Sequence, residues 1–97
     1  MNFIWDKQKN KDNVKKHGFD FADAHYLFDH PLLASLDERK EYGEDRWIGI
    51  GLLETRVVVI IFTEPDEDTV RVISLRKATT GERKRYEQAY KNEFSSD

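Results

Sequence analysis

The sequence predicts an α+β fold, an antiparallel sheet of three to four strands with two N-terminal helices and one C-terminal helix. The first observation is that helical patterns lie only near the two ends of the chain, while the middle has strand character. The second is that the strand segments are separated by turns short enough for antiparallel pairing. The third is the length of 97 residues, which suits one hydrophobic core, so residues 1–97 are expected to form a single domain.

The first helix is expected over residues 7–17. Asp6 precedes this segment and is a good N-cap, and Gly18 follows it as the left-handed residue that ends a helix. The helix is strongly polar, since Val14 is its only aliphatic residue, so it should rest weakly on the body of the domain. Residues 2–5 are either a short edge strand or a lead-in to this helix.

A second helix is expected over residues 21–30, capped by Asp20. Phe21, Ala24 and Phe28 fall on one helical face and should be buried. The helix should end at residue 30, because a proline follows and disfavours helical geometry in the residue before it.

The central strands follow a short strand over residues 32–36 and a charged loop. Segments 46–53 and 55–63 are expected to form a hairpin around Glu54. Segment 55–63 is apolar nearly throughout, which indicates a strand in the middle of the sheet.

A turn is expected over residues 64–68, followed by a strand over residues 69–77. Strict alternation along this strand places Val70, Val72, Ser74 and Arg76 on one face and Arg71, Ile73, Leu75 and Lys77 on the other. On that pattern, Arg71 and Arg76 cannot both bind one phosphate unless the end of the strand twists or bends.

The last helix is expected over residues 82–94. Thr79 and Glu82 have the spacing of a capping box at its start. Tyr86, Tyr90 and Phe94 follow at four-residue spacing on one face and are most simply core residues.

The charge is unevenly distributed along the chain. Charged residues make up 36% of it, with a net charge of −3. Residues 1–17 carry a net +3 and residues 71–91 a net +5, which leaves −11 for the remainder. If the two basic segments meet in the fold, one face could bind a polyanion. The alternative is that both charge runs are solvated helix faces.

The composition also restricts the chemistry and the compartment. The chain has no cysteine, which excludes disulfides, thiolate metal sites and a cysteine nucleophile. The three histidines lack metal-ligand spacing, and no glycine-rich phosphate loop or serine nucleophile elbow is present, so no metal or other cofactor is expected. No signal-peptide core or membrane-length apolar run is found, so we expect a soluble cytoplasmic protein.

Two clusters of basic residues are candidate sites. Arg76 and Lys77 end a strand just before a helix N-terminus, which favours phosphate binding. Lys16 and His17 precede Gly18 and are either a helix cap or a proton-transfer and phosphate-binding group. For Arg71, the alternative is a surface ion pair with Glu64 or Asp66 across the hairpin.

The order of residues along the chain also resembles a known family, the BrnT toxins of type II toxin–antitoxin systems, which are similar in fold to RelE-type ribonucleases. The resemblance covers most of the chain and rests on three groups of residues in order. These are Phe3, Trp5, Asp6, Lys9, Asn13, Lys16, His17, Gly18, Phe21, Ala24 and Phe28; Arg46, Trp47, Ile50 and Gly51; and Arg71, Ile73, Ser74, Arg76, Ala78, Glu82 and Tyr86.

The resemblance implies a small cytoplasmic toxin that cleaves RNA and so inhibits translation. Its partner would be a BrnA-like antitoxin that binds DNA and assembles with the toxin as a hetero-oligomer. Many members of the family have the sequence Thr-Glu-Arg here, where this chain has Thr63-Glu64-Pro65. If that arginine contributes to cleavage, activity is weaker here or the basic groups are rearranged.

RNA cleavage by attack of the 2′-hydroxyl needs a base, an acid and positive charge around the phosphorus, and no metal is required. We expect the catalytic residues to be His17, as base or acid, with Lys16, Arg71 and Arg76 stabilising the developing charge. Arg46 and Lys77 should hold the flanking RNA backbone.

A competing hypothesis is a binding module without catalysis that binds only an antitoxin or RNA. A DNA-binding protein is a weaker alternative, because the chain is acidic overall and has no two-helix unit with a basic second helix.

Overall fold

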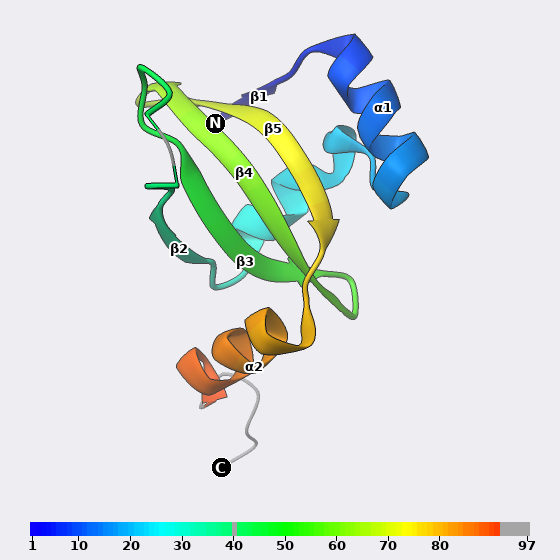
Figure 1. Ribbon diagram of the computed structural model, residues 1–97, viewed down its shortest axis with the longest axis vertical. Helices are drawn as coiled ribbons and strands as arrows, with labels where there is room; N and C mark the ends of the chain where they lie inside the picture. Colours follow the sequence, from blue (N-terminus) through cyan, green and yellow to red (C-terminus); the bar gives the residue numbers. More distant parts are fainter. Residues whose placement is uncertain (40, 92–97) are drawn as a thin grey trace.

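A computed structural model describes residues 1–39 and 41–91 of the chain (Figure 1). One sheet of five strands has the order β1-β5-β4-β3-β2, with helices on both of its faces. The elements in chain order are β1 (Asn2–Ile4), α1 (Lys7–His17), the 3₁₀-helix η1 (Phe21–Asp29), β2 (Leu33–Leu36), β3 (Trp47–Leu53), β4 (Arg56–Asp66), β5 (Thr69–Lys77) and α2 (Thr80–Ala89). The α+β class is confirmed.

The expected sheet of three to four antiparallel strands was wrong in two respects. The sheet has five strands, and it is mixed, because β1 pairs with β5 in parallel. Asn2 lies opposite Thr69, and its backbone N–H donates to the carbonyl of Asp68 at 2.6 Å. Of the two alternatives for residues 2–5, the edge strand is confirmed, but three residues carry too little pattern to show which strand they pair with, and that partner is more than sixty positions away.

Strand β4 is longer than its apolar run. It continues through Glu64 and Pro65 to Asp66, and the turn occupies only residues 67–68, so the expected turn over residues 64–68 was wrong. The register is irregular between Thr63 and Asp66, which accommodates a proline that cannot donate a ladder hydrogen bond. The hairpin therefore extends beyond the core as an exposed ribbon.

A bulge in β5 changes which arginines share a face. The pairing register between β4 and β5 shifts between Ile61 and Phe62 of β4, so Ile73 of β5 has no paired residue on β4. The pairs around the bulge are Thr63–Arg71, Phe62–Val72, Ile61–Ser74 and Val59–Arg76. Because paired residues point to the same face, Arg71 and Arg76 both project beside the odd-numbered residues of β4. The alternation that put them on opposite faces was wrong, since it assumed an uninterrupted strand.

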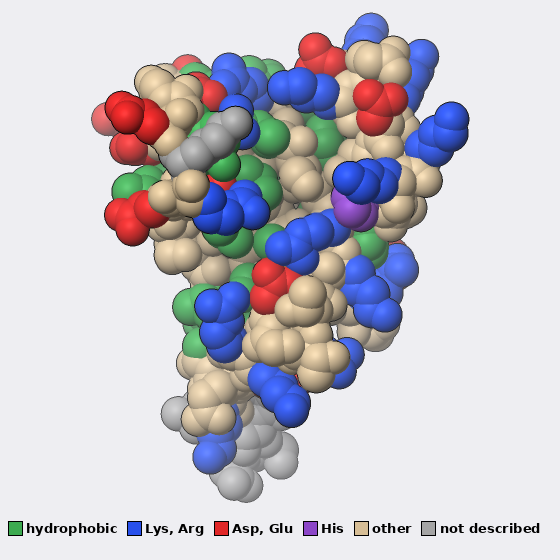
Figure 2. All heavy atoms as spheres, in the orientation of Figure 1, with side chains coloured by type: hydrophobic (Ala, Val, Ile, Leu, Met, Phe, Trp, Pro, Cys, Tyr) green, Lys and Arg blue, Asp and Glu red, His purple; other side chains and the backbone are tan. Residues whose placement is uncertain are grey.

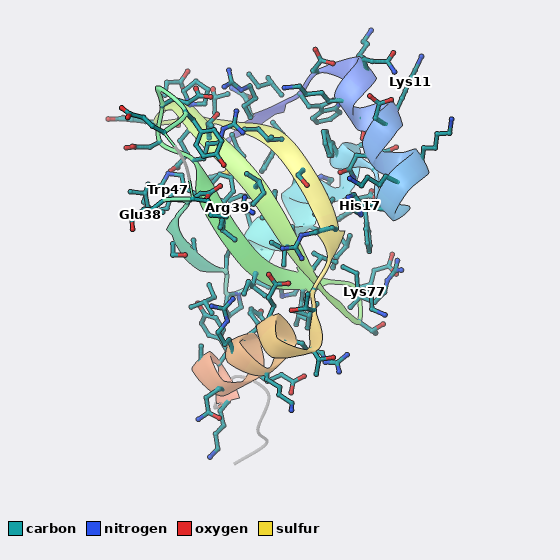
Figure 3. The ribbon with its side chains drawn as sticks, viewed as in Figure 1. Lys11, His17, Glu38, Arg39, Trp47 and Lys77 are labelled. Atoms are coloured by element: carbon teal, nitrogen blue, oxygen red, sulfur yellow. The ribbon has the colours of Figure 1, made fainter. Side chains whose placement is uncertain are left out.

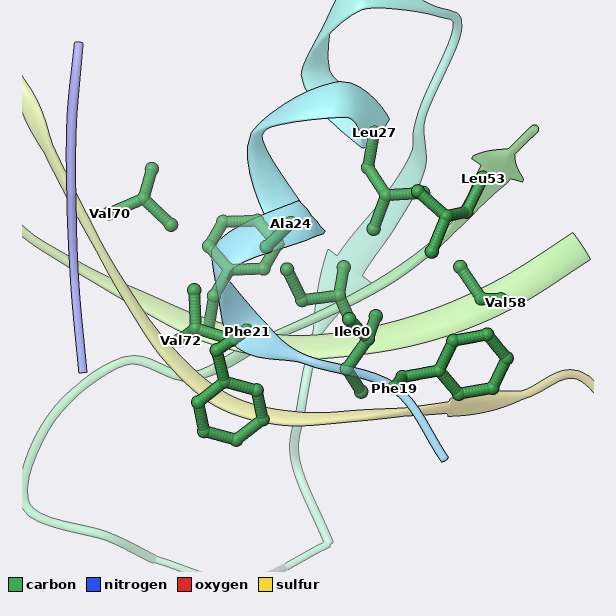
Figure 4. Packing of buried hydrophobic residues seen from close by; sticks show 11 residues of the cluster. Phe19, Phe21, Ala24, Leu27, Leu53, Val58, Ile60, Val70 and Val72 are labelled. Atoms are coloured by element: carbon green, nitrogen blue, oxygen red, sulfur yellow. The ribbon is translucent and has the colours of Figure 1, made fainter. Parts of the chain in front are cut away.

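The first core lies between η1 and one face of the sheet (Figure 4). Phe21, Ala24 and Leu27 are buried at three-residue spacing, whereas Phe28 is half-buried. Three residues is the period of a 3₁₀-helix. The sequence prediction assumed the longer period of an α-helix, and it therefore placed Phe28 in the buried face where the structure has Leu27. Gly51 of β3 permits close contact, since a Cβ there would lie 3.2 Å from Leu27 Cδ2.

Helix α1 has few apolar residues with which to pack on the sheet, and asparagine side chains hold it there by hydrogen bonds to the backbone of other segments. Asn13 is buried and donates to the carbonyls of Phe19 and Leu75, each at 2.9 Å, and it accepts from the Leu75 N–H at 3.2 Å. Asp6 and Gly18 cap the helix as predicted, with Gly18 at φ 78°. The C-terminal end of α1 is therefore fixed against β5.

The second core lies on the opposite face, where α2 covers one end of the sheet. Tyr86 is fully buried there, and its hydroxyl donates to the carbonyl of Pro31 at 2.8 Å. The rings of Tyr86 and Tyr90 are 5.1 Å apart, whereas Phe94 lies outside the described residues. The capping box of Thr79 and Glu82 is confirmed. No helix in the described part of the chain is long and apolar enough to cross a membrane.

Candidate active site and nucleic-acid interface

The face of the sheet that carries α2 is open beyond that helix and bears a cavity of about 240 Å³. Its floor is apolar and its rim is basic, with Arg39, Arg76 and Arg85 and the acidic Glu82. The floor residues are Leu33, Ile48, Ile50 and Ile61. Figure 2 shows hydrophobic side chains in the middle of this face, flanked by Lys and Arg. We call this cavity the arginine cavity.

Arg76 is held in place by Glu82. Its guanidinium donates to both carboxylate oxygens, at 2.8 and 3.0 Å, and to the Lys77 carbonyl at 3.2 Å. Glu82 also accepts from the backbone N–H of Thr79 in the capping box. Arg76 above all, and then the Thr79 N–H, hold the pKa of Glu82 at about 2, and the carboxylate raises the pKa of Arg76 in turn. The pair is therefore ionised and fixes the arginine at the start of α2.

Arg39 and Arg85 line the arginine cavity, although neither was predicted as a site residue. Arg39 is the more firmly held of the two. It follows β2 in the charged loop and donates to Asp37 with Nε at 2.8 Å and Nη2 at 2.9 Å. The Asp37 side chain is fully buried, and Arg39 lowers its pKa to about 2. Arg39 is close enough to Arg76 for their charges to repel, although they are 37 positions apart. No sequence signal marked Arg39, because the burial of Asp37, which holds it over the sheet, appears only in the fold.

Arg71 lies further along the same face and has a weaker partner. Its Nη2 donates to Glu44 at 2.6 Å, and both side chains are about 40% exposed. The alternative that Arg71 pairs across its own hairpin with Glu64 or Asp66 is not what the structure shows, because the partner comes from the loop before β3. An exposed pair of this kind contributes about 0–1 kcal/mol, so Arg71 can exchange its carboxylate for another anion.

Arg46 directly precedes β3, with its guanidinium 4.0 Å from the ring centroid of Tyr42. Within the described part of the chain, Arg46 Nε and Thr63 Oγ1 are the buried side-chain polar atoms with no hydrogen-bond partner. Thr63 pairs with Arg71, and Phe62, its neighbour, pairs with Trp47. Arg46, just before β3, thus lies near Thr63 of β4 and Arg71 of β5.

Lys16 and His17 meet β5 rather than pointing away from the sheet. They line a shallow hollow of about 230 Å³ together with Asn13 and Ser74. Ser74 pairs with Ile61, which is part of the floor of the arginine cavity, so the hollow and the cavity adjoin. Figure 3 shows His17 at the β5 side of this face and Arg39 at the β2 side. The basic end of α1 and the arginines therefore border one continuous surface.

Lys77 does not join Arg76. It lines a separate groove between α2 and the turn of the β3–β4 hairpin, as its position in Figure 3 indicates. Of the six residues predicted for the site, Lys16, His17, Arg46, Arg71 and Arg76 border the open face, and Lys77 lies apart. Among the described residues, no three His, Asp or Glu side chains are grouped so that they could hold a metal ion.

Comparisons with known proteins identify the family of the chain. The profile of a family described as "Ribonuclease toxin, BrnT, of type II toxin-antitoxin system" matches residues 5–82. The chain is similar to the crystal structure of the ribonuclease toxin BrnT of Brucella abortus, with 30% identity and a TM-score of 0.63. The similarity covers 82% of this chain and 99% of that one. No curated protein sequence matches the chain. The chain belongs to the BrnT family of ribonuclease toxins of type II toxin–antitoxin systems.

Proposed function

We propose that this toxin is an endoribonuclease that cleaves RNA on its open face without a metal ion and so inhibits translation. The observation that carries the proposal is the arginine cavity, where Arg39, Arg76 and Arg85 surround an apolar floor beside the basic end of α1. A guanidinium fork matches a phosphate group in geometry and charge. The floor between these groups is aliphatic, so the RNA is held mainly through its phosphates.

In the proposed reaction, the 2′-oxygen of a nucleotide attacks the adjacent phosphorus and the bond to the 5′-oxygen breaks. The 2′-hydroxyl loses a proton, the leaving 5′-oxygen gains one, and the products end in a 2′,3′-cyclic phosphate and a 5′-hydroxyl. His17 is the proton-transfer group, since an imidazole can accept or donate near neutral pH. Lys16, Arg71 and Arg76 stabilise the charge that develops on the phosphorane.

The remaining basic residues divide into two groups. Arg39 and Arg85 line the same cavity as Arg76, and Arg46 lies beside Arg71, so these three hold the RNA backbone on either side of the cleaved bond. Lys77 has no role in holding the RNA in this proposal, because it lines a different groove.

The test is cleavage of a defined single-stranded RNA by wild type, Arg76→Ala and His17→Ala, in the presence of EDTA. Arg76→Ala should reduce the cleavage rate by roughly 100-fold or more, as does loss of a group that stabilises developing charge. His17→Ala should also remove one limb of the pH–rate profile. Lys11→Ala is the matched control, because Lys11 lies on the same helix but away from both cavities (Figure 3).

Equal rates for wild type, Arg76→Ala and His17→Ala would overturn these roles. Activity that disappears with EDTA and returns with a divalent cation would overturn the metal-independent mechanism. The competing binding module predicts RNA binding without products, and one observation favours it. Pro65 is exposed in β4 and provides no cation where many members of the family have arginine. Pro65→Arg separates the two, because it should raise cleavage only if a catalytic site is otherwise complete.

We further propose that the antitoxin of this system is BrnA-like and binds DNA. A type II system pairs its toxin with a protein antitoxin. Expression of the toxin alone should arrest growth, and co-expression of the protein encoded beside it should restore growth. Persistent arrest in the presence of every neighbouring gene product would contradict the assignment of the partner.

A further inference from the structure

A second cavity lies at the opposite end of the sheet from the exposed β4–β5 ribbon. It opens between α2 and the turn of the β3–β4 hairpin and has a volume of about 660 Å³. Leu52, Val57 and Ala78 form its apolar part. Beneath the cavity, the backbone just after β5 is hydrogen-bonded to β4, since the Ala78 N–H donates to the Val57 carbonyl at 3.0 Å. We call this cavity, with its charged rim, the hairpin groove.

The rim of the hairpin groove is strongly cationic. Among residues 1–39 and 41–91, which the structure describes, its basic residues are Arg56, Lys77, Arg83 and Lys91, and its carboxylate is Glu87. Glu87 approaches Arg83 only to 3.8 Å, and both side chains are about half exposed. Figure 2 shows Lys and Arg side chains gathered beside the start of α2, below the end of α1. An acidic ligand is therefore favoured.

The hairpin groove is distinct from the arginine cavity. Glu82 and Arg85 of α2 line the arginine cavity, whereas Arg83, Glu87 and Lys91 line the hairpin groove. These two sets lie on either side of the buried Tyr86, which separates them as the helix turns. A ligand in the groove can thus bind without occupying the RNA-binding surface.

We propose that the hairpin groove is the docking site for the antitoxin, which contributes a segment with an apolar anchor flanked by carboxylates. The inference rests on the proposed function only for the existence of an antitoxin partner. RNA fits the rim charge but makes little use of an aliphatic floor that carries no aromatic side chain. A protein segment uses both features, since interface anchors typically bury an apolar side chain in a pocket with a polar rim.

The position of the groove also suggests how the antitoxin acts on the active site. Lys77 and Ala78 line the groove and directly follow Arg76 in the chain, and α2 carries Glu82, the partner of Arg76. A segment bound across this junction therefore contacts the two elements that position the arginine.

The experiment measures the dissociation constant of the full-length antitoxin, encoded beside the toxin gene, for three full-length toxins. These are wild type, Arg83→Glu/Lys91→Glu, and the matched control Lys7→Glu/Lys11→Glu. Both variants change the net charge equally and replace exposed residues, and thermal unfolding verifies that they fold. The groove variant should bind on the order of 10–100-fold more weakly, with loss of most of the salt dependence, and the control within about twofold of wild type.

Antitoxin affinity that is unchanged in the groove variant, or absent in wild type, would overturn the inference. So would a groove variant that loses RNA binding or changes the self-association of the toxin while antitoxin affinity persists, because the occupant would then be RNA or a second copy of the chain. RNA cleavage by the free toxins is measured in parallel. Its absence in all three would refute the proposed ribonuclease activity, while the antitoxin titration would still decide the docking site.

Discussion

Replacing Glu82 by glutamine keeps the shape of the side chain but removes the charge that holds Arg76. In the structure, the carboxylate accepts two hydrogen bonds from Arg76, at 2.8 and 3.0 Å, and one from the Thr79 N–H at 2.8 Å. A glutamine amide can still accept from Thr79, but it cannot accept both bonds from the guanidinium. Glu82→Gln therefore tests the ion pair more than the helix cap.

The magnitude follows from the pKa of Glu82, which is about 2 against an ordinary 4.5. Each unit corresponds to about 1.4 kcal/mol, and part of the shift comes from the Thr79 N–H, which the variant retains. The Arg76 side chain is 31% exposed, so solvent screening lowers the value further. We expect a loss of about 1–2 kcal/mol in the free energy of unfolding near pH 7, or roughly 5–15 °C in Tm.

Because folding lowers the pKa of Glu82, its stabilising contribution is complete above about pH 5 and is lost as the pH falls from 4.5 toward 2. Urea unfolding of wild type and Glu82→Gln should show a constant difference above that pH and less than half of it at about pH 3. Glu87→Gln is the control, since that exposed glutamate should change stability by less than about 0.5 kcal/mol. A difference that remains full-sized at about pH 3 would refute the ion-pair argument.

Three further substitutions test the packing and the charge of the fold. Gly51→Ala should cost about 1–2 kcal/mol in urea unfolding, because its Cβ would lie 2.9 Å from a leucine methyl, whereas Gly81→Ala meets nothing within 4 Å and should be neutral or slightly stabilising. Asn13→Ala should cost about 2–3 kcal/mol, since it leaves buried backbone groups of β5 unpaired, while Gln8→Ala on the same helix should change little. Arg71→Ala should leave Tm nearly unchanged, because its ion pair is exposed, yet weaken RNA binding in a gel shift; a large drop in Tm would contradict this assignment.

Local features of the chain were predicted well. Asp6, Gly18, Asp20 and the capping box that starts at Thr79 are all in the expected places, because a cap depends on residues three or four positions away. The β3–β4 hairpin was also predicted. The central position of β4 in the sheet follows from the unbroken apolar run of that strand.

The candidate site was only partly predictable. Arg76 stood out because it ends a strand beside a helix N-terminus, and the basic end of α1 stood out by composition. Arg39 did not, because it lies in a charged loop whose position over the sheet depends on the burial of Asp37. Lys77 was grouped with Arg76 as its neighbour in sequence, but the two side chains line different cavities.

By itself, the sequence determined the α+β class, the ends of most helices, the absence of cysteine chemistry and the presence of two basic segments. Only the tertiary structure decided which basic residues lie together. One bulged residue, Ile73, brings Arg71 and Arg76 to the same face, and Asn13 brings Lys16 and His17 to the edge of that face. The physical reason is that faces are set by hydrogen-bond register and packing between residues tens of positions apart, and a shift of one residue reverses every side chain beyond it.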